Sequence, residues 1–103
     1  MIAVVEEKRG QLAEMCRAYH VRRLEVFGSA ATGDRFDNRA SDLDFLVEFQ
    51  RTEEMNPADQ YFGLLEALKE LFGRDVDLVT ARSLRNPYFI RSVNATREAV
   101  YAS

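Results

Sequence analysis

The chain has 103 residues, 47% of them hydrophobic, and a formal net charge of −3. This length predicts one domain, spanning residues 1–103, with a single hydrophobic core. The acidic balance argues against direct nucleic-acid binding, because dedicated nucleic-acid binders usually present a basic surface.

Two features of the sequence, its single cysteine and its lack of a long apolar segment, indicate where in the cell the protein is located. Cys16 has no partner for an internal disulfide and falls on the apolar side of an expected helix, so we expect a small core residue. No apolar run approaches the roughly 18 residues that a membrane span needs, and the N-terminus does not resemble a secretory signal. We therefore expect a cytoplasmic protein that contacts no membrane.

The first half of the chain predicts one helix and two strands. Residues 2–19 have apolar positions near the helical period, weakened by Gly10, and predict one amphipathic helix. Residues 23–27 alternate between apolar and polar positions and predict a strand. The polar segment 32–41 is rich in turn formers and predicts a loop, and residues 43–49 predict a second strand.

The second half predicts a helix, a strand and a last helix. Asn56 before a proline is a strong helix start, and Gly73 marks the end of that helix. Residues 75–80 are short, β-branched and alternating, which predicts a third strand. Residues 86–101 predict a final helix. The order α-β-β-α-β-α indicates the α/β class, with a small mixed β-sheet of three strands and helices packed on one face.

Two carboxylates begin the second strand. Asp42 and Asp44 are two residues apart and share a face, and the apolar residues Leu43, Phe45 and Val47 share the other. The apolar face belongs in the core, so both acids point outward. Adjacent like charges raise each other's pKa unless a cation lies between them. Mg²⁺ suits such oxygen ligands and bridges to substrate phosphates.

A third carboxylate comes from the third strand, where Asp75 and Asp77 both project to one face. If the second and third strands are neighbours, one of these acids stands beside Asp42 and Asp44. Three carboxylates around two metal ions can activate an attacking hydroxyl and stabilise a leaving pyrophosphate. The residue type and spacing leave open which of the two acids contributes.

Gly28 and Ser29 follow the first strand and can contact a phosphate. Glycine lets the backbone approach closely, and a short helix that starts at Ser29 would direct free N–H groups toward an anion. Each pattern alone is common in ordinary turns and solvated strand faces. The three patterns in order, separated by strand-like runs, are much more specific.

These motifs resemble the minimal nucleotidyltransferases of the DNA polymerase β superfamily. The resemblance rests on segments 28–33, 41–47 and 76–79, and on the closing segment 90–101, which is similar to the terminal helix of the family. It covers nearly the whole chain from about residue 20 onward.

The resemblance implies a role for each matching residue. Gly28 and Ser29 would hold the β- and γ-phosphates of a nucleoside triphosphate. Asp42 and Asp44 would bind both of two Mg²⁺ ions. Asp77 would bind the metal on the attacking side and help to deprotonate the acceptor hydroxyl.

Family members of this size are typically antitoxins whose partner is a HEPN-type ribonuclease toxin, and some transfer AMP from ATP to a tyrosine of that partner. The resemblance therefore implies a Mg²⁺-dependent protein adenylyltransferase with ATP as substrate. The alternative is a non-catalytic antitoxin that neutralises its partner by binding alone. A small-molecule nucleotidyltransferase is disfavoured because such enzymes carry an added helical domain.

The segment between the two motifs departs from the family pattern. Twelve residues, 30–41, separate Ser29 from Asp42, which is longer than is common in the family. The position of Thr32 is often basic in relatives. Arg35 and Arg39 in the longer loop are candidates to compensate.

Overall fold

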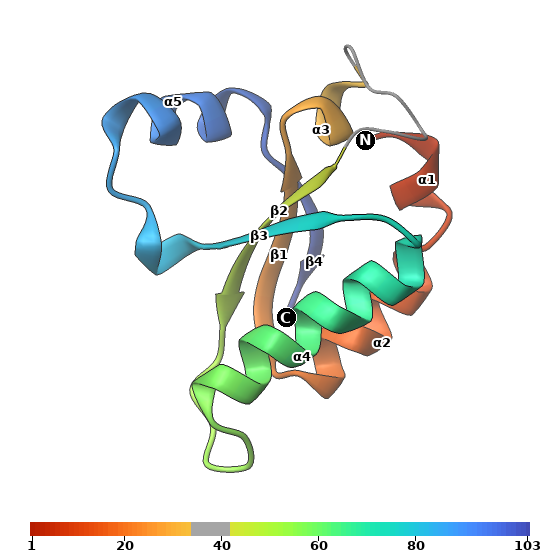
Figure 1. Ribbon diagram of the computed structural model, residues 1–103, viewed down its shortest axis with the longest axis vertical. Coiled ribbons are helices and arrows are strands. Elements are labelled where there is room, and N and C mark those ends of the chain that lie inside the picture. Colours follow the sequence, from red (N-terminus) through yellow and green to blue (C-terminus); the bar gives the residue numbers. More distant parts are fainter. Residues whose placement is uncertain (34–41) are drawn as a thin grey trace.

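The computed structural model describes residues 1–33 and 42–103 (Figure 1). Residues 34–41 lie outside the described part, and with them Arg35, Arg39 and most of the predicted loop. None of the described helices has both the length and the apolar character needed to cross a bilayer. The elements in chain order are α1 (Ala3–Glu6), α2 (Arg9–Ala18), β1 (Val21–Phe27), α3 (Ser29–Thr32), β2 (Leu43–Phe49), α4 (Pro57–Phe72), β3 (Val76–Thr80), the 3₁₀ turn η1 (Ala81–Ser83), α5 (Pro87–Thr96) and β4 (Glu98–Ala102).

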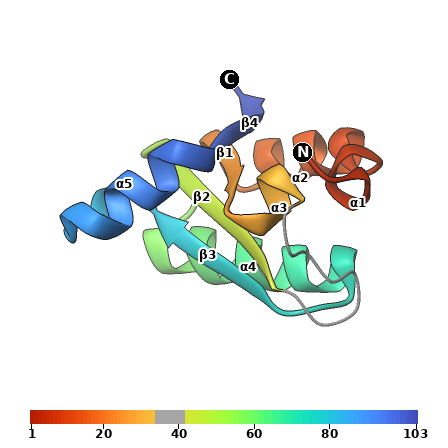
Figure 2. The ribbon, with the colours of Figure 1, turned by 90° about the horizontal axis from the view of Figure 1, so that it is seen from above.

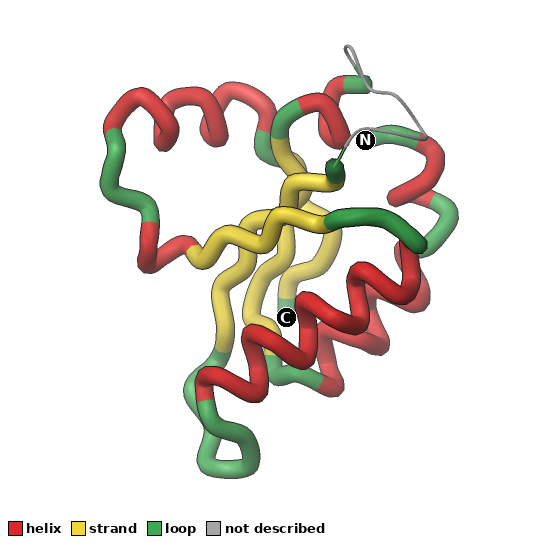
Figure 3. The backbone as a smooth tube through the Cα atoms, viewed as in Figure 1, coloured by secondary structure: helices red, strands yellow, loops and turns green. Residues whose placement is uncertain are grey.

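The sheet is small and mixed, as predicted, but within the described residues it has four strands rather than three. The strand order is β3-β2-β1-β4; β2 and β3 are parallel, and β1 is antiparallel to both of its neighbours. The prediction of a helix over residues 86–101 is wrong after Thr96, because Val100 and Tyr101 lie in β4 (Figure 3). β-Branched and aromatic residues suit a strand, and β4 pairs with an edge of β1 that would otherwise be open.

The N-terminal helix is divided in two. The prediction of one helix over residues 2–19 is wrong, because α1 ends at Glu6 and α2 begins at Arg9. The amide of Lys8 donates to the carbonyl of Val5 at 3.1 Å, an i→i−3 bond of the kind that tightens a helix end. Gly10 does not cause the break and lies within α2.

Two helices cover one face of the sheet, and a third lies on the other. The main core contains α2, α4 and the residues Leu43, Phe45 and Val47 of β2, which are almost fully buried. Helix α5 lies on the opposite side of the sheet from α4 (Figure 2). Its buried Val93 packs with Phe27 and Leu46. The prediction of helices on one face is therefore correct for α2 and α4 and wrong for α5.

Helix α4 begins and ends where the sequence predicts. The Asn56 side chain accepts a hydrogen bond from the Asp59 amide at 2.9 Å, which caps the N-terminus. At the other end Gly73 has φ +63°, in the left-handed region that glycine occupies without strain. The helix buries Leu64 and Leu68 completely. Local capping signals therefore define this element.

The packing of α2 against α4 depends on a glycine. A Cβ atom at Gly63 would lie 2.4 Å from Cε1 of Tyr19, whereas a Cβ atom at Gly10 would have no neighbour within 4 Å. The two glycines therefore provide a matched pair: both are helical, and only one is in a close contact.

We expect Gly63→Ala to destabilise the protein by about 1–3 kcal/mol, because the added methyl group overpacks the contact with Tyr19. Gly10→Ala should stabilise it by about 0.4–1 kcal/mol, because alanine reduces the entropy of the unfolded chain. Urea unfolding of both variants measures the two effects. If Gly63→Ala is as stabilising as Gly10→Ala, the close contact does not exist in solution.

Candidate active site

One row across three strands brings the predicted site residues together. Phe27 of β1 is the register partner of Asp44 in β2, and Asp44 is the partner of Asp77 in β3. Leu43 and Phe45 point into the core, so Asp44 points to the opposite face, where it is half-buried. The predicted outward orientation of this carboxylate is confirmed.

The structure also distinguishes the two acids of the third strand. Asp77 is the direct neighbour of Asp44 in the parallel pair, and its side chain is exposed. Asp75 precedes β3, and its carbonyl accepts a hydrogen bond from the Leu43 amide at 3.3 Å. Asp77 is therefore the acid that the register places beside Asp44.

The carboxylates of Asp77 and Asp42 both act electrostatically on Asp44. Burial, and then the negative charges of Asp77 and Asp42, raise the pKa of Asp44 from 3.8 to about 6. Asp42 itself lies just before β2 and is exposed. Within residues 1–33 and 42–103, no three histidine, cysteine or acidic side chains converge closely enough to form a ready metal cluster. Asp42 and Asp77 are therefore close enough to Asp44 to repel its charge, but the three carboxylates are not arranged to bind one metal ion together.

Gly28 lies directly against Asp44 and has a backbone conformation that strongly favours glycine. Its backbone has φ +68° and ψ −147°, a conformation that is essentially restricted to glycine. A Cβ atom there would also lie 3.0 Å from Oδ2 of Asp44. The structure thus brings Gly28 and Asp44 together, as the sequence predicts.

The short helix expected at Ser29 is present as α3. Its first turn closes when the amides of Ala31 and Thr32 donate to the Gly28 carbonyl at 3.0 and 3.2 Å. The amides of Ser29 and Ala30 have no acceptor within this helix, because the first N–H groups of any helix lack one. Ser29 is half-buried beside the carboxylates' end of the sheet.

Three residues near the site were missed by the sequence analysis. The Thr96 hydroxyl accepts the Gly28 amide at 2.8 Å, and the Arg97 guanidinium binds the Glu25 carboxylate through Nε at 3.1 and 3.2 Å and also through Nη2. Glu25 is charged, yet it is only 4% exposed. The alternation of β1 placed Glu25 on the same side as Phe27, and nothing local indicated that α5 would cover that side.

A cavity of about 430 Å³ lies away from these residues. It lies where β2 leads into α4, and Phe49, Met55, Tyr61 and Thr80 are among its lining residues. The predicted site lies at the opposite end of β2, around Asp44. The cavity therefore contributes nothing to the carboxylate site.

Residues 8–100 match the family model of the nucleotidyltransferase domain. The chain belongs to this family. It is 38% identical to MJ1379 of Methanocaldococcus jannaschii, provisionally named a protein adenylyltransferase, over 73% of this chain and 72% of that one. It is 35% identical to the protein adenylyltransferase MntA of Thermococcus cleftensis, over 85% and 81% of the two chains.

Solved structures have the same fold as this nucleotidyltransferase. A provisionally assigned minimal nucleotidyltransferase superposes with a TM-score of 0.71 at 31% identity, over 91% of this chain and 90% of that one. A chain in the complex of the tri-AMPylated Shewanella oneidensis HEPN toxin with its MNT antitoxin has a TM-score of 0.64 at 19% identity, with coverages of 96% and 73%. The nucleotidyltransferase-like fold inferred from the motifs is therefore confirmed.

The raised pKa of Asp44 predicts how the stability of the metal-free protein depends on pH. Between pH 3.8 and about 6 the folded state holds more protons on Asp44 than the unfolded state does, so the free energy of unfolding falls as pH rises. Asp44→Asn should remove this loss and stabilise the protein at pH 7 by roughly 1–2 kcal/mol, allowing for solvent screening of a half-buried group.

Urea unfolding at pH 4 and pH 7 without divalent cations measures this effect. Asp75→Asn is the matched control, because it removes a nearby exposed carboxylate that is not the register partner of Asp44. The gain should be present at pH 7 and absent at pH 4 for Asp44→Asn, and small at both for the control. Equal gains for the two variants at pH 7 would contradict the coupling around Asp44.

Proposed function

We propose that this nucleotidyltransferase is a Mg²⁺-dependent protein adenylyltransferase that acts as an antitoxin. It would transfer AMP from ATP to a tyrosine hydroxyl of a HEPN-type ribonuclease toxin. The observation that carries the proposal is the row that places Asp44 between Gly28 on one side and Asp77 on the other. The names of MntA and of the AMPylated HEPN toxin complex support the substrate and the partner.

The donor set fits Mg²⁺. Asp42 and Asp44 offer carboxylate oxygens, and their mutual repulsion with Asp77 is the charge imbalance that a divalent cation relieves. Mg²⁺ usually keeps several waters and binds one or two carboxylates together with substrate phosphates, so it needs no ready cluster of three protein ligands. We assign Asp42 and Asp44 to both of two Mg²⁺ ions and Asp77 to the ion on the attacking side.

The phosphates would lie at the start of α3. Gly28 permits close approach because it has no side chain, and Ser29 offers a hydroxyl and an amide. These two residues would hold the β- and γ-phosphates. The α-phosphate then lies toward Asp44, where the transfer occurs.

The reaction exchanges one phosphorus–oxygen bond for another. The acceptor hydroxyl transfers its proton to the Asp77 carboxylate, and the hydroxyl oxygen forms a bond to the α-phosphorus of ATP. The bond from that phosphorus to the bridging oxygen breaks, and pyrophosphate leaves with the bonding electrons. Bound Mg²⁺ would stabilise the charge on the attacking and leaving oxygens.

The exposure of Asp77 suits a protein acceptor. Its side chain is open to solvent at the edge of the sheet, so a tyrosine on the surface of a partner can reach it. We infer that residues 1–103 function as one minimal nucleotidyltransferase domain. The partner protein would position its own acceptor tyrosine at the site. The free, buried Cys16 is compatible with the reducing cytoplasm that we propose as its location.

A non-catalytic antitoxin is the second candidate. The observation that favours it is that the carboxylates do not converge on one point in the described chain. Such a protein would neutralise its partner by covering it, and the carboxylates would have no chemical role. The two candidates differ in whether neutralisation needs Asp42 and Asp44.

We expect the double variant Asp42→Asn/Asp44→Asn to lose AMP transfer by at least about 10²-fold, because the charges that hold the metal and phosphates are gone. The assay incubates the protein with Mg²⁺, α-labelled ATP and the HEPN-type toxin proposed as its partner, and measures the label on the toxin. Chelation of Mg²⁺ should have the same effect on the wild type. Asp75→Asn is the control and should retain transfer.

The same proteins then separate the two candidates. If transfer is the mechanism, the toxin stays inactive after the wild-type antitoxin and ATP have been removed, and the double variant fails to neutralise it. If the double variant neutralises the ribonuclease at the wild-type stoichiometry, binding alone is sufficient and the transferase proposal is wrong.

A further inference from the structure

Helix α5 packs on the sheet face beside the site, against Phe27 at the end of β1 and Leu46 of β2. Phe89 meets Phe27 edge to face with ring centroids 6.0 Å apart, and Val93 is fully buried against Phe27 and Leu46. The chain then passes from α5 into β4 through Thr96 and Arg97. This junction is where α5 comes closest to Gly28.

The Thr96 hydroxyl is fixed by two hydrogen bonds. It accepts the Gly28 amide at 2.8 Å and donates to the Ser92 carbonyl within α5 at 3.4 Å. The first bond joins residues that are 68 positions apart in the chain. Thr96 thus connects the end of α5 to the Gly28 turn, whose backbone conformation only glycine adopts easily.

Arg97 holds the same junction from its other side. Its guanidinium binds the buried Glu25 through Nε and Nη2, while Nη1 donates to Asn94 at 2.8 Å. A bidentate pair of this kind fixes orientation as well as distance. The end of α5 is therefore anchored two residues along β1 from Phe27 as well as at Gly28.

We propose that Thr96 is a positioning residue of the nucleotide site: its hydroxyl holds the Gly28 turn against Asp44. This inference rests on the proposed function, since it assigns the turn to phosphate binding. It also changes the expected role of Gly28. Its amide already donates to Thr96, so it contributes close approach rather than a donor, and donors to a phosphate come from Ser29 onward.

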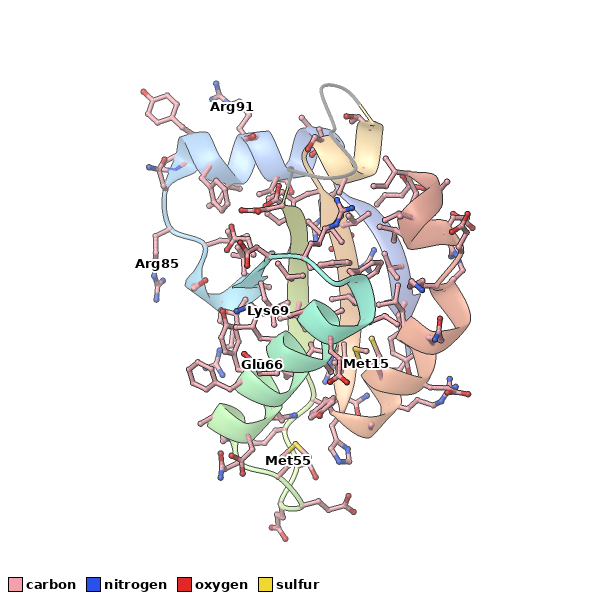
Figure 4. The ribbon with its side chains drawn as sticks, turned by 45° about the vertical axis from the view of Figure 1, so that its right-hand side comes forward. Met15, Met55, Glu66, Lys69, Arg85 and Arg91 are labelled. Atoms are coloured by element: carbon pink, nitrogen blue, oxygen red, sulfur yellow. The ribbon has the colours of Figure 1, made fainter. Side chains whose placement is uncertain are left out.

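Two substitutions separate the hydroxyl from the rest of the side chain. Thr96→Val removes the hydroxyl and keeps the shape, and Thr96→Ser keeps the hydroxyl. Arg91→Ala is the control for α5 in general, because Arg91 is exposed and projects away from the sheet (Figure 4). The amide of the buried Phe45 serves as an internal reference for global unfolding.

The first measurement is amide hydrogen exchange of the full chain by NMR. In Thr96→Val the Gly28 amide should exchange at least about fivefold faster, because it loses its acceptor and is only half-buried, while the Phe45 amide keeps its rate. Thr96→Ser and Arg91→Ala should stay within about twofold of the wild type. An unchanged Gly28 rate in Thr96→Val would overturn the proposal.

The second measurement is the kinetics of AMP transfer to the toxin. Thr96→Val should raise KM for ATP about fivefold with kcat within twofold, and Thr96→Ser should restore the wild-type KM. Equal KM values in the valine and serine variants would overturn the positioning role, because a general loss of packing would affect both. If the wild type transfers no AMP, the dissociation constant of AMP-PNP with Mg²⁺ replaces KM under the same two criteria. The positioning role is then decided separately from the transferase proposal.

Discussion

The site depends on the register that aligns Phe27, Asp44 and Asp77 across three strands. Burial of Leu43 and Phe45 sets this register, because a strand shifted by one residue would turn its whole apolar face to solvent. The same shift would bury the Asp44 carboxylate in the core without a partner. The packing that folds β2 therefore also directs the Asp44 carboxylate to the face opposite the main core.

The folded chain keeps Asp44 in an environment that disfavours its charge. Asp44 is half-buried, has two acidic neighbours, Asp42 and Asp77, and lies against the backbone of Gly28. A purely structural position would relieve this repulsion with a basic side chain or with solvent. Strain of this kind, concentrated on one carboxylate beside a glycine-only turn, is typical of sites that complete their charge balance with a ligand.

Local signals in the sequence were sufficient for much of the fold and for the charged half of the site. The caps at Asn56 and Gly73 placed α4, and the alternation around Asp44 and Asp77 placed both carboxylates on one face. The last strand was not predictable in this way. Val100 lies seven residues after Val93, which suits a continuing helix, and only pairing with the distant β1 makes it a strand. Residues 34–41, which are most of the predicted loop, lie outside the described structure.

The C-terminal segment, which was predicted as a helix and contains β4, also stabilises the Gly28 turn of the site. Because β4 pairs with the outer edge of β1, the end of α5 must return to β1, and that return brings Thr96 to Gly28 and Arg97 to Glu25. The carboxylates thus depend on alternation within two adjacent strands, whereas the glycine turn depends on contacts about 70 residues away in the chain. Local sequence patterns therefore predict the carboxylates but not the distant residues that hold the glycine turn. The search for positioning residues in other small domains of this family should therefore begin where the last helix meets the last strand.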